Sequence, residues 1–178
     1  MPDRLAVHGG TPVRSTPLWY AKGAAMLGDE ERTALLDVLE SRSLFRYYGT
    51  SLLNKVLTFE NTLCEMTGAA HAIAVSSGTA ALRASLAALG VGCGDEVIVP
   101  AVTFIATVNA VVTAGAVPIF AEIDDTFGLN AIDVAARITP RTAAIIAVHL
   151  ENAACDIDGI VDVASRAGAP VKIGRAHV

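Results

Sequence analysis

The residues best suited to chemistry in this sequence lie between an apolar segment and a helix-forming segment. Ser76-Ser77-Gly78-Thr79-Ala80-Ala81-Leu82 follows the apolar run 72–75 and leads into a run rich in alanine and leucine that ends at Gly90. A strand that turns sharply here into a helix exposes the unpaired N–H groups of the first helical turn, at the positive end of the helix dipole. Thr79 adds a hydroxyl and Gly78 lets an anion approach closely, so the stretch indicates a phosphate-binding site. The alternative is that Ser76, Ser77 or Thr79 only caps the helix.

The elements that must position this turn alternate along the chain. Apolar runs predict strands at 71–75, 96–99, 116–121 and 143–149 and a last strand that opens at Pro170, with helices at 80–89, 104–114, 131–137 and 158–167 between them. Such alternation predicts an α/β fold with a mostly parallel sheet and flanking helices. Two earlier helices are expected, at 29–40 and about 53–67, with Asp29 as the cap of the first, and Asp158 is expected to cap the helix at 158–167.

Composition narrows the class of protein. Of the 178 residues, 53% are hydrophobic and 17% charged, which favours a well-buried core over disorder. A net charge of −5 gives no reason to expect nucleic acid or an acidic membrane surface as a partner. The three cysteines, Cys64, Cys93 and Cys155, have no metal-site or disulfide spacing and are expected to be reduced thiols of a cytoplasmic protein. The apolar window 103–120 divides into a helix and a strand at Gly115, so we do not expect it to span a membrane.

Several motifs occur in an order and spacing that resemble a known family. They are SSGTAAL at 76–82, GDEVIVP at 94–100, TFIATVNAV at 103–111 and GAVPIF at 115–120, together with 138–150, Phe59-Glu60 and His8-Gly9-Gly10-Thr11-Pro12. This order resembles the pyridoxal-phosphate (PLP) aminotransferases of fold type I, and most of all the DegT–DnrJ–StrS group that acts on keto sugars and keto cyclitols. The resemblance implies an N-terminal segment at 1–50, the first half of the PLP-binding large domain at 51–171, and a homodimer when the protein is full length.

The resemblance also assigns roles to individual residues. Ser77, Gly78, Thr79 and Ala80 are implied to hold the cofactor phosphate, with Ser77 the weaker member of the set, and Phe104 to stack on the pyridine ring. His149 and Asn152 are candidate substrate contacts; the alternative for His149 is a packing or hydrogen-bonding residue at the end of its strand.

The residues that such an enzyme needs for catalysis are missing from this sequence. A PLP aminotransferase requires a lysine that holds the cofactor as a Schiff base, but Lys22, Lys55 and Lys172 do not stand in the family's lysine context and are expected to be solvated amines. The resemblance also implies an acidic motif after 169–171, whose aspartate pairs with the ring nitrogen, and residues 172–178 do not match it. We therefore expect 172–178 to be a non-native tail on a truncated chain, the alternative being a genuine basic tail of a shorter protein.

Three functions follow from these observations. The first is a truncated PLP-dependent aminotransferase that moves an amino group from a glutamate- or glutamine-type donor to a keto sugar or keto cyclitol; the fragment itself is expected to be inactive. The second is a PLP- or pyridoxamine-phosphate-dependent sugar dehydratase of the same family, and the third is a non-catalytic regulator that keeps the fold. A nucleotide-binding domain is disfavoured because no G-x-G-x-x-G follows a strand.

Overall fold

The computed structural model describes residues 4–16, 23–151 and 153–175. The chain forms two compact units, Met1–Ala72 and Ile73–Val178. None of the described helices is long and apolar enough to cross a membrane.

The first unit is made of short helices joined by loops. It contains the 3-10 turns η1 (Ala6–His8) and η2 (Gly23–Met26) and the helices α1 (Asp29–Ser41) and α2 (Lys55–Thr67). Both predicted helices are therefore confirmed. In the loop between them, Arg46 forms an ion pair with the buried carboxylate of Glu60 on α2, and the rings of Phe45 and Tyr48 stack with their centroids 4.8 Å apart.

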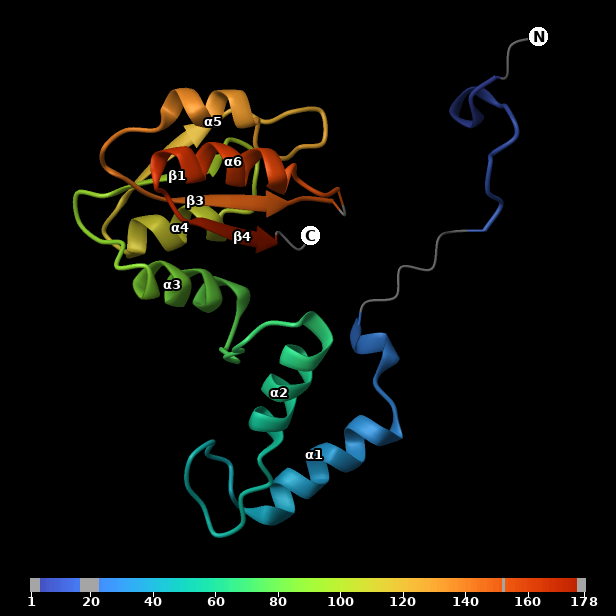
Figure 1. The fold of residues 1–178 in the computed structure, drawn as a ribbon. Helices are drawn as coiled ribbons and strands as arrows, with labels where there is room; N and C mark the ends of the chain where they lie inside the picture. The colour runs from blue at the N-terminus through green and yellow to red at the C-terminus, as the bar shows by residue number, and fades with distance from the viewer. Residues whose placement is uncertain (1–3, 17–22, 152, 176–178) are drawn as a thin grey trace. The chain divides into compact units, whose positions relative to one another are not determined.

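The second unit is built on a sheet of four described strands that all run parallel, which confirms the predicted parallel sheet but gives one strand fewer than the five expected. The strands are β1 (Glu96–Pro100), β2 (Val117–Ala121), β3 (Thr142–His149) and β4 (Val171–Arg175), in the order β2-β1-β3-β4. Helices α3 (Gly78–Ala88) and α4 (Ala106–Thr113) cover one face, while α5 (Ala131–Arg137) and α6 (Ile157–Ala167) cover the other (Figure 1). The crossover helices explain why all four strands run in the same direction.

The two faces of the sheet bury two separate sets of side chains. On β1, Val97 and Val99 pack toward α3 and α4, while Ile98 packs toward α5 and α6. All five residues of β1 are buried, because a central parallel strand is covered on both faces. The same period of two continues on β3, where Ile146 belongs to the first set and Ile145 to the second.

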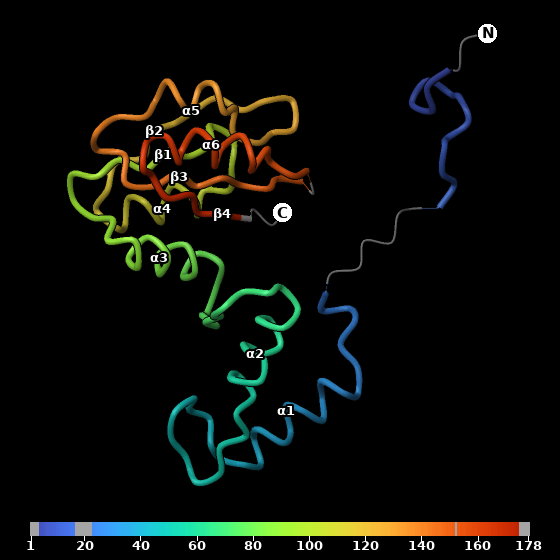
Figure 2. The backbone as a smooth tube through the Cα atoms, in the orientation of Figure 1, coloured from blue at the N-terminus to red at the C-terminus, as the bar shows by residue number. Residues whose placement is uncertain are grey.

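The path of the chain fixes which end of α3 meets which edge of the sheet. The chain leaves α3 at Ala88 and enters β1 at Glu96 through a turn in which Asp95 Oδ2 accepts a hydrogen bond of 2.8 Å from the Gly92 N–H. Helix α3 therefore runs against the direction of β1, and its N-terminus lies at the edge where the strands end. Figure 1 shows this N-terminus on the side of the arrowheads of β3 and β4, and Figure 2 traces the same path.

The opposite edge of the sheet, where the strands begin, is held by a buried carboxylate. Glu96 accepts hydrogen bonds from the Thr139 hydroxyl at 2.5 Å and from Arg141 Nε at 2.9 Å. The Thr139 hydrogen bond, followed by that of Arg141, holds the pKa of Glu96 below its usual value. This network joins the start of β1 to the loop that precedes β3. It therefore lies at the opposite edge of the sheet from the first turn of α3.

One predicted strand is wrong. Residues 71–75 have no strand structure. Ile73 remains 78% exposed and Val75 42% exposed. An apolar, β-branched run becomes a strand only when a neighbouring strand forms hydrogen bonds with it. The described sheet has the order β2-β1-β3-β4 and ends at β2 and β4.

Both predicted helix caps are also wrong, each by a short distance. The cap of α1 is Gly28 rather than Asp29: the Gly28 N–H donates to Glu31 Oε2 at 2.7 Å, which lowers the pKa of Glu31. Asp156, not Asp158, caps α6 by accepting a hydrogen bond of 3.1 Å from the Gly159 N–H. In each case an acidic side chain is placed three residues from the backbone amide with which it pairs.

Candidate functional site

The first turn of α3 presents free backbone donors at the edge where the strands end. Helix α3 begins two residues earlier than predicted, so Gly78 and Thr79 are its first two residues. Ser77 is the N-cap: its hydroxyl oxygen accepts from the Ala80 N–H at 3.1 Å, and its carbonyl accepts from the Ala81 N–H at 2.9 Å. Within the described chain, the N–H groups of Gly78 and Thr79 have no acceptor.

The surroundings of these two amides leave room for a ligand. Gly78 and Thr79 are exposed, and apart from the adjacent backbone no described atom lies within 4 Å of the place where a β-carbon on Gly78 would stand. Two N–H groups at the positive end of the α3 dipole therefore face open space, and the exposed Thr79 carries a hydroxyl on the same turn. These are the donors that bind a phosphate or another oxyanion at a helix N-terminus.

Phe104 lies in the loop that leaves the same edge of the sheet. The loop follows β1 and is held at its start by a hydrogen bond of 2.9 Å from the Ala101 N–H to the Ala121 carbonyl of β2. The Phe104 carbonyl accepts from the Thr107 N–H at 3.0 Å as α4 begins. Its side chain is 53% exposed, so Phe104 is not a core residue, and its ring offers an apolar surface to a flat ligand.

His149 ends β3 and is bonded to the loop that follows it. The residue is half-buried, and its Nδ1 accepts a hydrogen bond of 3.0 Å from the Cys155 N–H. Burial raises the pKa of the Cys155 thiol, which keeps this thiol protonated at neutral pH. Beyond β3, the Ala153 N–H donates to the Leu150 carbonyl at 2.8 Å, and Glu151 has a φ of 50°. Asn152, the second predicted substrate contact, lies outside the described residues.

The topology brings the predicted residues to one edge of the sheet from two sides. The first turn of α3 and the loop with Phe104 belong to the α3 and α4 side. Side chains alternate along β3, and Ile145 and Ala147 pack toward α5 and α6, so His149 lies on that second side. A ligand at this edge would meet amide donors and an aromatic ring from one side and an imidazole from the other.

The described lysines occupy different environments. Lys55 lies 3.9 Å from Asp37 in an exposed ion pair of the first unit. Lys172, on β4, is half-buried, which corrects the expectation that it is solvated; burial lowers its pKa, and its Nζ donates to the Ile173 carbonyl at 2.6 Å. Lys22 lies outside the described residues.

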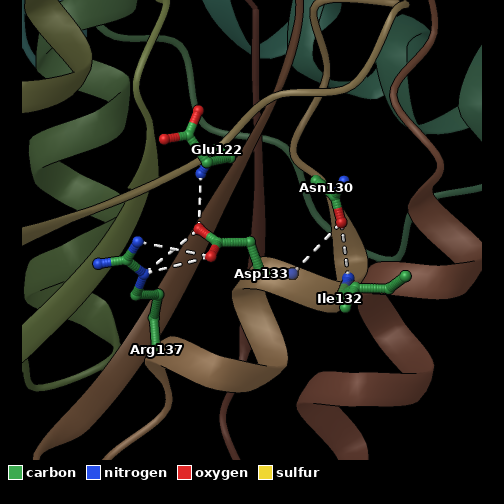
Figure 3. A network of polar contacts seen from close by, with 5 residues as sticks. All are labelled: Glu122, Asn130, Ile132, Asp133 and Arg137. Atoms are coloured by element: carbon green, nitrogen blue, oxygen red, sulfur yellow. Dashed lines mark hydrogen bonds and ion pairs between the residues drawn. The ribbon is translucent and has the colours of Figure 1, made fainter.

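The sequence did not predict a polar network that holds the loop after β2 against α5 (Figure 3). Asn130 caps α5 by accepting from the Ile132 N–H at 2.9 Å. Asp133 accepts from the Glu122 N–H at 2.8 Å, which lowers its pKa, and pairs with Arg137 at 3.3 Å. Asn130 before an apolar helix was a readable cap signal, whereas the bond from Glu122 to Asp133 spans a loop and had none.

Comparison with known proteins finds one matching family and several similar solved structures. The model of the DegT/DnrJ/EryC1/StrS aminotransferase family matches residues 26–177. The solved structure of 3-amino-5-hydroxybenzoic acid (AHBA) synthase is 36% identical over 88% of this chain and 39% of that chain, with a TM-score of 0.75. An aminotransferase from Psychrobacter cryohalolentis is 36% identical over 83% of this chain and 36% of its own, with a TM-score of 0.76.

A third match was solved with its cofactor. It is the PLP form of the putative sugar aminotransferase Spr1654 from Streptococcus pneumoniae, which is 33% identical over 79% of this chain and 34% of its own, with a TM-score of 0.70. The present chain therefore spans about two fifths or less of the length of the solved structures that it matches.

Proposed function

From the premise that this chain belongs to the DegT/DnrJ/EryC1/StrS aminotransferase family, we propose that it forms the cofactor-phosphate site of a PLP-dependent sugar aminotransferase. The whole enzyme would transfer an amino group from a glutamate- or glutamine-type donor to a keto sugar or keto cyclitol. We also propose that the whole protein is a cytoplasmic homodimer in amino-sugar, cell-surface glycan or secondary-metabolite biosynthesis.

The observation that carries this proposal is the first turn of α3. Gly78 and Thr79 offer two amides without an acceptor in the described chain, beside an exposed hydroxyl and open space. A phosphate dianion satisfies all of these donors together. Ser77 and Ala80 flank the position, and the Ala80 N–H reaches a phosphate only when the Ser77 hydroxyl releases it.

The other residues at the edge would hold the remainder of the cofactor and the substrate. The half-exposed ring of Phe104 is suited to stack on the pyridine ring, because an apolar face leaves the opposite side of the cofactor open. We propose His149 and Asn152 as substrate contacts, since the loop after β3 leaves the same edge of the sheet.

The chemistry itself depends on groups beyond the phosphate site. When bound, PLP supplies an electron sink for the transfer of the amino group. The residues named above would bind and orient the cofactor, and none of the three lysines of the chain stands in the lysine context of the family. We therefore propose that the 178-residue chain has no aminotransferase turnover. A sugar dehydratase would use the same phosphate site and is the alternative.

The test is PLP affinity in a pair of variants at one atom. Thr79→Val removes the hydroxyl and keeps the shape of the side chain, whereas Thr79→Ser keeps the hydroxyl. Calorimetric titration of the chain with PLP should show a loss of about 1.5–3 kcal/mol of binding free energy in Thr79→Val, the worth of a hydrogen bond to a charged group. Thr79→Ser should bind nearly as the parent does. Equal affinities of all three proteins would mean that the turn only caps α3.

A further inference from the structure

The two ring nitrogens of His149 are in different situations. Nδ1 accepts a hydrogen bond of 3.0 Å from the Cys155 N–H. For Nε2, the described part of the chain provides no partner. Because a main-chain amide can only donate, Nδ1 must carry its lone pair in this arrangement, and in a neutral imidazole the proton then sits on Nε2.

We propose that Cys155 is a positioning residue that holds His149 as the Nε2–H tautomer, so that His149 offers a proton donor rather than a lone pair at the edge where the strands end. The fixed tautomer follows from the hydrogen bond alone. Only the further consequence, a ligand that presents an oxygen acceptor such as a hydroxyl, carbonyl or phosphate oxygen to Nε2, rests on the proposed function.

The donor amide is held in place from both sides along the chain. On one side, the Ala153 N–H donates to the Leu150 carbonyl at 2.8 Å and closes the turn that follows β3. On the other side, Asp156 caps α6, which packs against β3 through Ile160 and Ala164. The Cys155 side chain is buried in that same core, so its N–H cannot turn away without disturbing the packing.

The alternative tautomer of His149, with the proton on Nδ1, would place two hydrogen-bond donors opposite each other. A proton on Nδ1 would face the Cys155 N–H across 3.0 Å, which loses one hydrogen bond and places two positive hydrogens together. Burial raises the pKa of the Cys155 thiol, so no thiolate is present there to accept a proton from Nδ1. The contribution of Cys155 is therefore its backbone amide, and Cys155→Ala should preserve the tautomer.

The direct test is nitrogen NMR of the 178-residue chain labelled with ¹⁵N in histidine. Two-bond proton–nitrogen correlations should assign His149 to the Nε2–H form in both the parent and Cys155→Ala. An Nδ1–H pattern, or the averaged pattern of a freely exchanging imidazole, would overturn the proposal. This measurement needs no cofactor, so a failure of PLP binding would leave its result intact.

A pair of variants at His149 separates the two nitrogens. The Asn side chain in His149→Asn places an acceptor oxygen near the Nδ1 position, whereas the Gln side chain in His149→Gln reaches the Nε2 position and lacks that acceptor. Hydrogen exchange of the Cys155 amide should stay slow in His149→Asn and become about tenfold faster in His149→Gln, as expected for one lost hydrogen bond. Equal protection in both variants would show that another group holds the amide, and would overturn the proposal.

Discussion

A hydrogen bond of 3.1 Å joins the Ala80 N–H to the hydroxyl oxygen of Ser77 at the start of α3. It divides the donors of this turn into two sets. The Ala80 amide stabilises the helix, while the amides of Gly78 and Thr79 stay available to a ligand. Capping and the proposed phosphate binding, which were competing interpretations of one motif, would therefore use different atoms of the same turn.

Two substitutions of Ser77 should separate stability from affinity. Ser77→Ala removes the cap and should lower the free energy of unfolding by about 1 kcal/mol. Ser77→Asp keeps a capping oxygen but places a negative charge beside the phosphate position. It should melt like the parent and bind PLP about tenfold or more weakly, as expected for two like charges a few ångströms apart. Thermal melting and calorimetric titration measure the two effects; a Ser77→Asp variant with full PLP affinity would contradict this division of donors.

Leu86 should be a main anchor of α3 on the sheet. Its side chain is completely buried in the core between α3, α4 and the strands. Leu86→Ala should cost about 2–5 kcal/mol of unfolding free energy, because it removes buried contacts and leaves a cavity. Leu89→Ala is the matched control, since Leu89 at the end of the same helix is 44% exposed. Urea denaturation measures both, and comparable losses in the two variants would refute this packing of α3.

Glycine should fit the left-handed backbone at position 127 better than alanine does. Phe127 has a φ of 61°, in the left-handed region, and the residue is 51% exposed. Phe127→Gly and Phe127→Ala both delete the ring, but only glycine accepts this backbone without cost. The glycine variant should be the more stable of the two by about 1 kcal/mol in urea denaturation. Greater stability of the alanine variant would mean that this turn is not left-handed in solution.

The pH dependence of stability should show how much the ionised Glu96 carboxylate contributes. Its pKa is lowered by the hydrogen bonds from Thr139 and Arg141, so its contribution to stability is present above the ordinary pKa of a glutamate. That contribution is lost as the pH falls through the lowered value in the folded protein. Thermal melting from pH 7 to pH 3 should therefore show the parent more stable than Glu96→Gln at neutral pH, with the difference shrinking in acid. A difference that grows as the pH falls would contradict the sign of the shift.

The lysines of this chain should not support turnover. With PLP and an amino donor, the parent should show no amino transfer in a coupled keto-acid assay, because none of its three lysines stands in the lysine context of the family. Lys172→Met and Lys55→Met should leave the visible spectrum of the mixture unchanged. Turnover by the parent, or a colour lost only in one of these variants, would identify a lysine that does react with the cofactor.

The second unit was largely predictable because its signals are local. The apolar runs that became β1, β2 and β3 are short and end at turn residues, and the alternation of strands with helices implies parallel pairing. The failed strand at 71–75 has the same composition, but a ladder also needs a neighbour, and composition does not report one.

The site was predictable in part for the same reason. Gly78 and Thr79 lie within one turn of a helix, so the local sequence was enough to predict their free backbone N–H groups. The bond from the Cys155 N–H to His149 and the bond from the Glu122 N–H to Asp133 each join residues across a loop. These two hydrogen bonds depend on how each loop folds against a helix, and residue spacing in the sequence does not predict that fold.

The most direct test of the central claim compares PLP with pyridoxal, which lacks the phosphate. If the Gly78 and Thr79 amides and the Thr79 hydroxyl hold a phosphate, calorimetric titration of the parent chain should give PLP an affinity at least about 100-fold higher than that of pyridoxal, since each hydrogen bond to a charged group contributes about 1.5–3 kcal/mol. Inorganic phosphate should compete with PLP. Equal affinities for PLP and pyridoxal would contradict the account, because the first turn of α3 would then have no part in binding the cofactor.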